Sequence, residues 1–373
     1  MMRLAIIGAG GMAGQHAQRF QEIADVEVVA VCDLDGDKAH TFAAEHGISA
    51  VYTDLEAMLA RDDIDAVSNV TPDGVHKATT LAAIAAGKHV LCEKPLATNA
   101  TDADEMAAAA REAGVINMVN LSYRDAPAIQ LARELVAEGR LGRVMHVDAS
   151  YRQSWLVSDA WGRWDQDSQW LWRLSEAHGS KGVLGDVGVH ILDFASFPVG
   201  DIAAVTCRLK CFDKAPDNRI GEYSLDANDS ALMQVEFAGG ALGTVQATRW
   251  ATGHHNSLTL SVHGDRGALR VDLDAARDRV QVCLARTSIL RVGSTSRRRP
   301  RRASISVSSI ASKAASTTSP TSPAARSCSV CWMPVSTPTL EAASCTWRRS
   351  RARLPEPYRP ADIHHGPPCR GGE

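Results

Sequence analysis

The most constraining feature of this sequence is a glycine-rich turn close to its start. The short apolar run 4–7 is followed directly by Gly8-Ala9-Gly10-Gly11-Met12-Ala13, which fits the spacing G-x-G-x-x-G/A, and then by a helical stretch to about residue 23. Glycines at these positions permit a tight turn and close backbone approach to a pyrophosphate, whose charge is met by the helix N-terminus. The turn therefore predicts dinucleotide contacts from Gly8, Gly10, Gly11, Met12 and Ala13.

A carboxylate follows the second apolar run, at the position where a dinucleotide-binding βαβ unit has one. The apolar run 26–32 ends at Asp33, 20 positions beyond Ala13, where a carboxylate can accept hydrogen bonds from the adenosine ribose hydroxyls. Asp33 also repels a 2′-phosphate, and no arginine follows it closely, so the sequence favours NAD(H) over NADP(H). The alternative is an ordinary glycine turn beside a solvated aspartate.

The same alternation of short apolar runs and helices continues to about residue 120. Apolar runs at 66–70, 89–92 and 116–119 alternate with alanine-rich helical windows at 75–86 and 100–113, and Gly87 and Gly114 stand at helix stops. Continuous apolar runs are typical of parallel strands covered on both faces. The pattern predicts an α/β Rossmann domain with a doubly wound parallel sheet over residues 1–122.

The pattern changes after residue 122. A helix at 126–138 ends at Gly139, and partly alternating, strand-length segments follow, joined by Gly/Asp turns. These segments are 144–155, 203–212, 230–237, 241–250, 258–263 and 268–273. They predict an α+β C-terminal domain over residues 123–284 with an open-faced, mostly antiparallel sheet.

Two segments carry candidate chemistry. Lys94 and Pro95 follow a predicted parallel strand, at the edge where open α/β sheets bind ligands, and a cis bond at Pro95 would aim Lys94 into the cleft. Asp186 and His190 are four apart and share a face if helical, so that the carboxylate could orient an imidazole that takes an alcohol proton. The alternatives are a surface lysine in a loop and a helix with a satisfied histidine.

Four segments together resemble the Gfo/Idh/MocA oxidoreductases, the relatives of glucose-fructose oxidoreductase, inositol dehydrogenase and MocA. They are the glycine turn, residues 71–76 (TPDGVH), residues 86–96 (AGKHVLCEKPL) and residues 185–190 (GDVGVH). The resemblance covers residues 1 to about 284. It implies a Rossmann domain, a second domain with an open-faced sheet that often makes dimer or tetramer contacts, and NAD(P)-dependent redox chemistry on sugars, inositols or related polyols.

The resemblance also implies roles for individual residues. Lys94 would bind and polarise the reacting oxygen, His190 would accept or donate the proton, and Asp186 would support His190. The nicotinamide side of the cofactor would contact Thr71, Pro72, His76, Glu93, Lys94 and Asn120. The family often has Asn at the position of Asp73, so the contact there departs from the family pattern.

A cluster of tryptophans precedes the Asp186/His190 segment. Five of the eight tryptophans fall within residues 155–172, among arginines. Flat rings against C–H faces, with polar groups beside them, suit a carbohydrate or cyclitol, and no obvious phosphate clamp is present. Candidate substrate contacts are Arg124, Trp155, Trp161, Trp164, Trp172 and Arg173. A packed loop or a subunit contact explains the cluster equally well.

Charge and composition change abruptly near residue 284. Residues 285–373 hold 15 Lys+Arg and 4 Asp+Glu, a charge of +11, whereas the first 284 residues carry −14; the tail also holds 10 of the 15 prolines. Such a composition predicts poor order and a compromised C-terminal sheet. A basic arm that binds nucleic acid and half a zinc site at residues 328–331 are alternatives, although no second C-x-x-C follows.

A frameshift at about residues 284–286 explains more of the tail's composition than a basic arm or a zinc site does. Cys331-Trp332-Met333-Pro334 must be encoded TGY-TGG-ATG-CCN, which becomes Leu-Asp-Ala when the first two bases are dropped. A Leu-Asp-Ala helix segment resembles what the family carries near its C-terminus. Sequencing the gene across this point tests the hypothesis.

The sequence therefore predicts an NAD(H)-dependent oxidoreductase that interconverts a secondary alcohol of a sugar or cyclitol with its ketone. We expect no metal, no membrane segment and no nucleic-acid partner, a reducing, cytoplasmic setting, and a homodimer or homotetramer if the C-terminal sheet is complete. A catalytically silent NAD(H)-binding sensor or regulatory protein is the main alternative.

Overall fold

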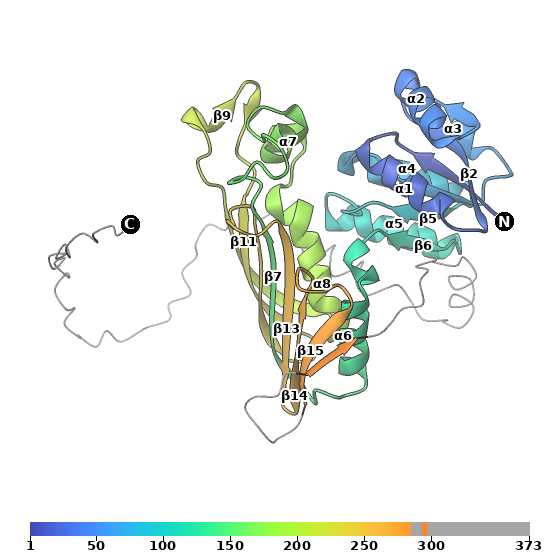
Figure 1. Cartoon of the computed structure of the whole chain (residues 1–373). Helices are drawn as coiled ribbons and strands as arrows, with labels where there is room; N and C mark the ends of the chain where they lie inside the picture. Colours follow the sequence, from blue (N-terminus) through green and yellow to red (C-terminus); the bar gives the residue numbers. More distant parts are fainter. Residues whose placement is uncertain (285–292, 297–373) are drawn as a thin grey trace, which may run out of the picture. The chain divides into compact units, whose positions relative to one another are not determined.

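The structure is a computed structural model that describes residues 1–284 and 293–296. Its first part contains a six-stranded parallel sheet of order β3-β2-β1-β4-β5-β6 (Figure 1). The strands are β1 (Met2–Ile7), β2 (Val26–Cys32), β3 (Ala50–Tyr52), β4 (Ala66–Asn69), β5 (His89–Cys92) and β6 (Asn117–Val119). The helices are α1 (Gly11–Gln21), α2 (Gly36–His46), α3 (Leu55–Leu59), η1 (Asp73–Val75), α4 (His76–Ala85) and α5 (Ala100–Glu112). This order confirms the predicted doubly wound fold.

Both faces of the parallel sheet are buried, as its continuous apolar strands predict. Alternate residues of β1 belong to different hydrophobic clusters: Ala5 and Ile7 to one, Leu4 and Ile6 to the other. Because all six strands run parallel, their carboxyl ends lie along a single edge of the sheet. The loops that leave this edge carry the predicted cofactor and catalytic residues.

The second part contains an eight-stranded sheet of order β16-β15-β14-β13-β7-β12-β11-β8. Its strands are β7 (Val144–Gln153), β8 (Ile202–Lys210), β11 (Ser230–Phe237), β12 (Leu242–Thr248), β13 (Asn256–Gly264), β14 (Gly267–Asp272), β15 (Arg279–Leu284) and β16 (Gly293–Ser296). A separate hairpin pairs β9 (Arg219–Ile220) with β10 (Tyr223–Ser224). The sheet is mostly antiparallel, as predicted, with one parallel pair, β7 and β12.

Helices cover one face of this second sheet. Side chains of α6 (Pro127–Ala137) and α8 (Val189–Val199) share one hydrophobic cluster with the inward residues of the strands (Figure 1). The outward side chains of β11 and β12 are exposed, Leu232 to 56% and Leu242 to 59%. The remaining short helices are η2 (Ser122–Asp125), α7 (Ser168–Leu171), η3 (Trp172–Leu174), η4 (Glu176–His178), η5 (Leu184–Gly188) and η6 (Pro216–Asn218). The sheet is therefore open-faced.

Most predicted element boundaries are close to the observed ones, and three strands, β2, β5 and β11, coincide with them. Several elements were not predicted, among them α2, α3, β3 and β15. Helix α2 is polar and shows little apolar periodicity, but Asp35 accepts a hydrogen bond from Lys38 N at 3.1 Å at its start, and Gly47 ends it with φ +66°. These two capping signals could have revealed it.

The basic tail, residues 285–373, lies largely outside the described residues, as do most of the proposed frameshift site and the C-x-x-C segment. Within the tail, residues 293–296 form β16, which pairs antiparallel with β15. This strand was not expected, since the tail was predicted to be poorly ordered from residue 285. In the part of the chain that the structure describes, no helix is long and apolar enough to cross a membrane.

Candidate active site

The glycine turn at the end of β1 fits a dinucleotide pyrophosphate. Gly8 has φ +95°, and a Cβ there would lie 2.9 Å from the carbonyl oxygen of Val70, so only glycine fits. A Cβ added at Gly10 or Gly11 would meet no heavy atom within 4 Å, which leaves room for a ligand. Helix α1 begins here without a side-chain cap or an acidic residue in its first turn. Its amide groups can therefore face an anion.

Two further residues of the turn take different positions. Ala13 is fully buried in the hydrophobic cluster beneath α1, where a small residue allows close helix–strand packing. Met12 is 45% exposed at the start of the helix. Ala13 thus supports the turn, whereas Met12 is accessible to a ligand.

Asp33 at the end of β2 braces the glycine turn. Its carboxylate accepts hydrogen bonds from Ala9 N at 2.7 Å and from Asp35 N at 3.0 Å, and Lys38 Nζ lies 3.4 Å away. Burial alone would raise the pKa of Asp33, but these amides and Lys38 outweigh burial and lower it. The carboxylate is therefore charged beside a cavity of about 390 Å³ lined by Ala9, Gly10, Gly11, Gly14, Lys38, Thr41, Phe42, Glu45 and His46.

The loops after β4 and β5 are joined by a buried histidine. The ring nitrogens of His76 lie 2.7 Å from the carbonyl oxygen of Pro95 and 2.8 Å from that of Thr71. The peptide bond between Lys94 and Pro95 is cis, as the sequence suggested. Pro72 is exposed on the same turn. His76 thus ties together the two loops that were expected to contact the nicotinamide.

A buried polar network lies behind Lys94. Glu93 Oε1 accepts a hydrogen bond from Asn120 Nδ2 and lies 2.9 Å from His16 Nε2, while Glu93 Oε2 accepts one from Lys94 N at 3.1 Å. The other ring nitrogen of His16 lies 2.8 Å from Ser68 Oγ. Burial alone would raise the pKa of Glu93, but His16 and Asn120 outweigh burial and lower it to about 2. His16 was not predicted as a site residue, because a single histidine on a helix gives no signal of its partners.

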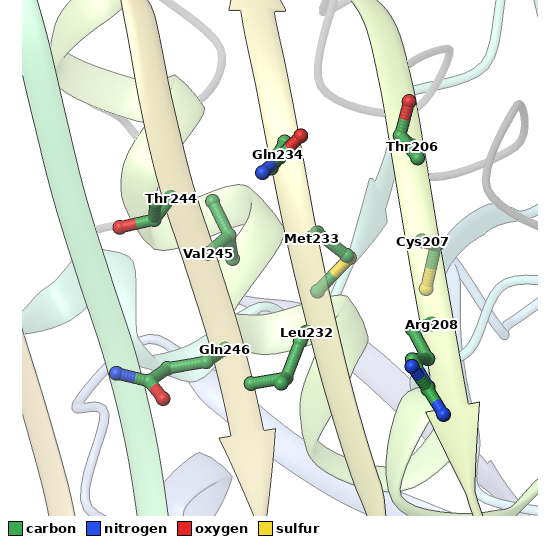
Figure 2. A pocket seen from close by; sticks show the side chains of 9 residues that line it. All are labelled: Thr206, Cys207, Arg208, Leu232, Met233, Gln234, Thr244, Val245 and Gln246. Atoms are coloured by element: carbon green, nitrogen blue, oxygen red, sulfur yellow. The ribbon is translucent and has the colours of Figure 1, made fainter. Parts of the chain in front are cut away.

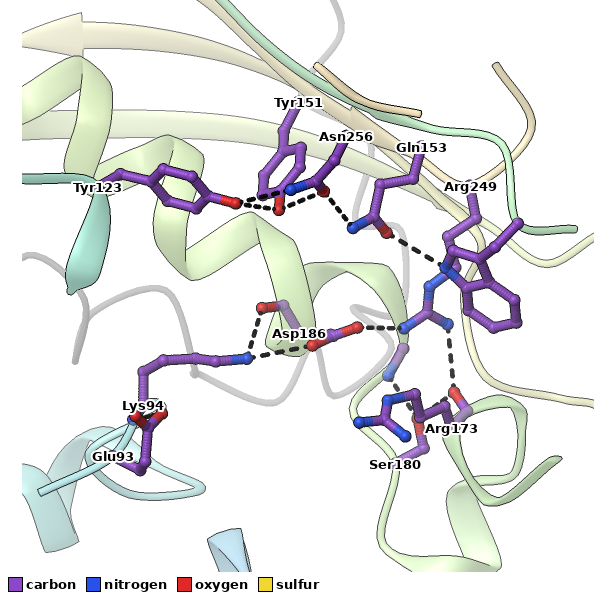
Figure 3. A network of polar contacts seen from close by, with 12 residues as sticks. Glu93, Lys94, Tyr123, Tyr151, Gln153, Arg173, Ser180, Asp186, Arg249 and Asn256 are labelled. Carbon is purple, nitrogen blue, oxygen red and sulfur yellow. Dashed lines mark hydrogen bonds and ion pairs between the residues drawn. The ribbon is translucent and has the colours of Figure 1, made fainter. Parts of the chain in front are cut away.

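Lys94 meets the second part of the chain at Asp186 (Figure 3). Its Nζ donates hydrogen bonds to Asp186 Oδ1 and to the Asp186 carbonyl oxygen, both at 3.1 Å. Asp186 Oδ2 accepts a hydrogen bond from Arg249, also at 3.1 Å, and the Arg249 side chain is fully buried. Burial alone would raise the pKa of Asp186, but Lys94 and Arg249 hold it well below its usual range. One carboxylate therefore bridges two cations.

The carboxylate of Asp186 acts on His190 through its charge, which favours the protonated imidazole, and its hydrogen bonds go to other residues. Asp186 lies in the π-helical turn η5, whose wider turn breaks the i,i+4 relation, and its carboxylate bonds to Lys94 and Arg249 instead. Two cations attract a carboxylate more strongly than a neutral imidazole does. Sequence periodicity could not reveal the π turn, because it assumes 3.6 residues per turn.

His190 lies on α8 with 8% of its surface exposed. Tyr123 packs edge-on against the ring at 5.1 Å between centroids, and Tyr151 lies at 6.5 Å. Among the described residues, His190 Nδ1 has no hydrogen-bond partner. Burial, and then the charge of Lys94, lower the pKa of His190 to about 3. The imidazole is therefore neutral near pH 7, the state that a proton acceptor requires.

A chain of uncharged polar groups lies across from Lys94 (Figure 3). The Tyr123 and Tyr151 hydroxyls are 2.6 Å apart, and Asn256 Oδ1 accepts hydrogen bonds from Tyr151 at 2.7 Å and from Gln153 Nε2 at 2.9 Å. Asn256 Nδ2 donates to the Tyr123 hydroxyl at 3.0 Å. These residues were not predicted, because they come from η2, β7 and β13, which are far apart in the sequence and are brought together only by the fold.

The predicted substrate contacts divide into two groups. Trp155 is 2% exposed and packs in a small hydrophobic cluster, with Trp161 and Trp164 half-buried against it. This is the packed loop that the sequence left open as an alternative. Trp172 is 36% exposed beneath the Arg173 guanidinium, at 4.7 Å from it.

The side chain of Arg124, also predicted to contact the substrate, pairs with Asp193. Its guanidinium makes two-pronged hydrogen bonds to Asp193, which is 2% exposed, and lies 4.7 Å from the Phe197 ring. An arginine held in this way by a buried carboxylate has a structural role, so the structure does not support Arg124 as a substrate contact.

The described residues contain no group of three or more His, Cys, Asp or Glu side chains placed to hold a metal ion. A lysine, a carboxylate and a neutral imidazole, brought together beside a Rossmann domain, are a set that a nucleotide-dependent oxidoreductase could use.

Comparison with known proteins gives the family. Residues 2–121 match the oxidoreductase family with an NAD-binding Rossmann fold, GFO_IDH_MocA, and residues 129–270 match the GFO/IDH/MocA C-terminal domain. The chain belongs to this family of NAD-binding oxidoreductases, as the sequence motifs indicated.

Several relatives have known activities. Levoglucosan dehydrogenase of Pseudarthrobacter phenanthrenivorans is 29% identical over 310 residues, 76% of either chain. The 1,5-anhydro-D-fructose reductase of Ensifer adhaerens is 32% identical over 272 residues, 72% of this chain and 75% of the relative. The solved complex of levoglucosan dehydrogenase with NADH and L-sorbose matches with a TM-score of 0.70 and 28% identity, covering 79% of either chain.

Proposed function

We propose that this chain interconverts a secondary alcohol of an unphosphorylated sugar or cyclitol with its ketone, using NAD(H). The observation that carries the proposal is the meeting of Lys94, from the cofactor-binding domain, with Asp186 at 3.1 Å, while His190 lies close enough for Lys94 to depress its pKa. Retention of this set supports an enzyme over a catalytically silent sensor.

Each residue has a role in this reaction. NAD⁺, when bound, supplies the acceptor for the hydride. Lys94 Nζ binds the substrate oxygen and stabilises its negative charge as the proton leaves. His190 takes the alcohol proton at Nε2, since Nδ1 is buried. Asp186 holds Lys94 in place, and Glu93 fixes the backbone of Lys94 through its amide.

The cofactor preference follows from Asp33. A charged carboxylate at the end of β2 accepts hydrogen bonds from ribose hydroxyls and repels a 2′-phosphate, which favours NAD(H). Lys38, at 3.4 Å from Asp33, offsets part of this repulsion. We therefore expect a preference for NAD(H) that is moderate in size.

The substrate class follows from the polar chain of Tyr123, Tyr151, Asn256 and Gln153. Hydroxyl and amide groups give and accept single hydrogen bonds, which suits the hydroxyls of a polyol. Relatives named for levoglucosan, 1,5-anhydro-D-fructose and D-glucosides act on related compounds. These groups favour a neutral sugar or cyclitol.

A panel of neutral sugars and cyclitols with NAD⁺, followed at the nicotinamide absorbance, tests the proposal. We expect reduction with at least one member and none with His190→Asn on the same substrate. NADH binding, measured by fluorescence, should be equal in both proteins. If the panel gives no reduction, and the matching ketones no oxidation of NADH, while NADH binds tightly, the silent sensor becomes the better account.

We also propose that the open sheet face joins copies of this chain. A groove of about 460 Å³ crosses β8, β11 and β12, and Leu232 is one of its lining residues (Figure 2). Leu232 and Leu242 are exposed on the outward face of β11 and β12. Exposed apolar patches rimmed by polar residues are typical of protein interfaces. Leu232→Glu should convert a dimer or tetramer into a smaller species in light scattering, and an unchanged mass would contradict the proposal.

Two sequence-based predictions accompany this function. The division between the cofactor domain and the second domain at residues 122 and 123 coincides with η2, and limited proteolysis can test it. The cytoplasmic setting remains a prediction from the sequence, which fractionation of the producing cells can test. The nucleic-acid alternative rests on the tail and lies outside the described residues.

A further inference from the structure

Arg249 is a buried cation that the proposed reaction does not use directly. It follows β12, and its side chain has no exposed surface. Its guanidinium donates to Asp186 Oδ2 at 3.1 Å and to the Arg173 carbonyl oxygen at 3.2 Å, and lies 4.8 Å from the Trp155 ring. Trp155 is itself fixed, because its Nε1 donates to Gln153 Oε1 at 3.2 Å. Arg249 is therefore held on several sides.

Lys94 is held much less firmly. Its side chain is 23% exposed, and its Nζ reaches Asp186 across four methylene groups. To bind the substrate oxygen, this amine must give up part of its contact with Asp186. A carboxylate left without a cation in a partly buried site is unfavourable, so a lysine paired with a lone carboxylate would be hard to release.

We propose that Arg249 is a positioning residue that keeps Asp186 neutralised, so that Lys94 can leave it for the reacting oxygen. Asp186 then has one permanent cation on Oδ2 and one exchangeable cation on Oδ1. Arg249 also prevents the carboxylate from rotating, which fixes where Lys94 waits before substrate arrives. This inference rests on the proposed function, because it acts through Lys94.

The test is a double-mutant cycle on turnover of an active polyol. Arg249→Met should lower kcat about tenfold with KM for NAD⁺ changed less than twofold. Lys94 is then the only one of the two hydrogen-bonded cations left on Asp186, and Arg173 remains as a nearby positive charge. Arg249→Lys, which keeps the charge, should recover part of the loss. Asp186→Asn/Arg249→Met should be no slower than the slower single variant, because without the charge of Asp186 nothing retains Lys94.

Lys88→Met is the matched control. Lys88 is a buried cation, 8% exposed, that donates to the Arg61 carbonyl oxygen at 2.8 Å, at the amino end of β5 rather than the carboxyl end. It should change thermal stability and leave kcat close to that of the native chain. Thermal midpoints and NADH binding, measured for every variant, show whether each one is folded.

The outcomes separate this inference from the proposed function. If Lys94→Met turns over normally, the proposed role of Lys94 fails, and this inference fails with it. If Lys94→Met is inactive but Arg249→Met is fully active, or if the losses of Asp186→Asn and Arg249→Met multiply, only the inference about Arg249 is overturned.

Discussion

The two sides of the candidate site are built differently. The cofactor side consists mainly of backbone: the Gly8–Gly11 turn, the first amides of α1 and the short loops after β4 and β5. The substrate side consists of side chains from remote elements, such as Tyr123, Asp186, Arg249 and Asn256. A site built from backbone requires particular residues at a fixed spacing along the sequence. A site built from side chains requires only that the fold bring those side chains together.

This difference explains how the two sides can change. A glycine turn tolerates few replacements, since its function depends on a backbone conformation and on open space. A set of converging side chains can be altered one residue at a time, and each change adjusts the fit to a different hydroxyl pattern. We therefore expect variants of the two sides to fail in distinct ways, one in cofactor binding and the other in turnover.

Lys94→Met should give the largest effect on turnover. Loss of the positive charge at the reacting oxygen should lower kcat by about 10²- to 10³-fold, because a preorganised donor to a developing charge is worth that much. NADH affinity should stay within about twofold of that of the native chain, because Lys94 is expected to act on the substrate oxygen. Steady-state kinetics and fluorescence titration measure both quantities. A large loss of NADH affinity instead would place Lys94 on the cofactor side and break the comparison.

His190→Asn should lower kcat by about 10²-fold through loss of the proton acceptor. The same variant changes the pH dependence of stability. His190 has a pKa of about 3 in the folded chain and about 6.5 when unfolded, so the unfolded state binds the extra proton between these values.

This component of stability is present above about pH 6.5 and is lost as pH falls toward 3. Denaturant midpoints between pH 4 and pH 7 should therefore fall less in His190→Asn than in the native chain. Parallel curves for the two proteins would show that His190 is accessible to protons in the folded state.

Two glycine variants distinguish, on the cofactor side, a glycine required by the fold from one required by the ligand. Gly8→Ala should destabilise the fold by about 1–3 kcal/mol and weaken NADH binding, because φ is +95° and the Cβ meets Val70 O at 2.9 Å. Gly10→Ala should weaken NADH binding alone, since its Cβ meets nothing within 4 Å until a pyrophosphate arrives. Thermal melts with and without NADH separate these effects. Equal stability losses would show that Gly10 is constrained by the fold rather than by a ligand.

Asp33→Ser should give the smallest effect, a shift in cofactor preference. Removing the carboxylate should raise the ratio of NADPH to NADH affinity about tenfold, or about 1.4 kcal/mol. Lys38 is then free of its partner at 3.4 Å and can pair with a 2′-phosphate. Asp33→Ser/Lys38→Met should lose most of this gain. An unchanged ratio in Asp33→Ser would mean that the adenosine ribose lies elsewhere.

The elements that carry the candidate cofactor side could be predicted from the sequence, because their determinants are local. Gly8, Asp33 and Lys94 each follow a strand whose apolar run is visible in the sequence, and a parallel sheet must bring those ends together. The family motifs then supplied Asp186 and His190.

The substrate side could not be predicted in the same way. The π turn at Asp186 could not be predicted from a helical period of 3.6 residues. Asn256 lies on β13 and Arg249 directly follows β12, and no local pattern specifies the register of these strands. The tryptophans stood out by number, yet Trp155 is a core residue. Composition reports that aromatic residues are clustered, but not which of them face solvent.

Helix α1 links the glycine turn to the main chain of Lys94. It begins at the glycine turn and carries His16, which grips Glu93 and, through it, the main chain of Lys94. A nucleotide bound to the first amides of this helix therefore contacts the same helix that positions Lys94 through His16 and Glu93. The consequence is kinetic order: the nucleotide should enter first and leave last, and the carbohydrate should bind poorly to the empty protein.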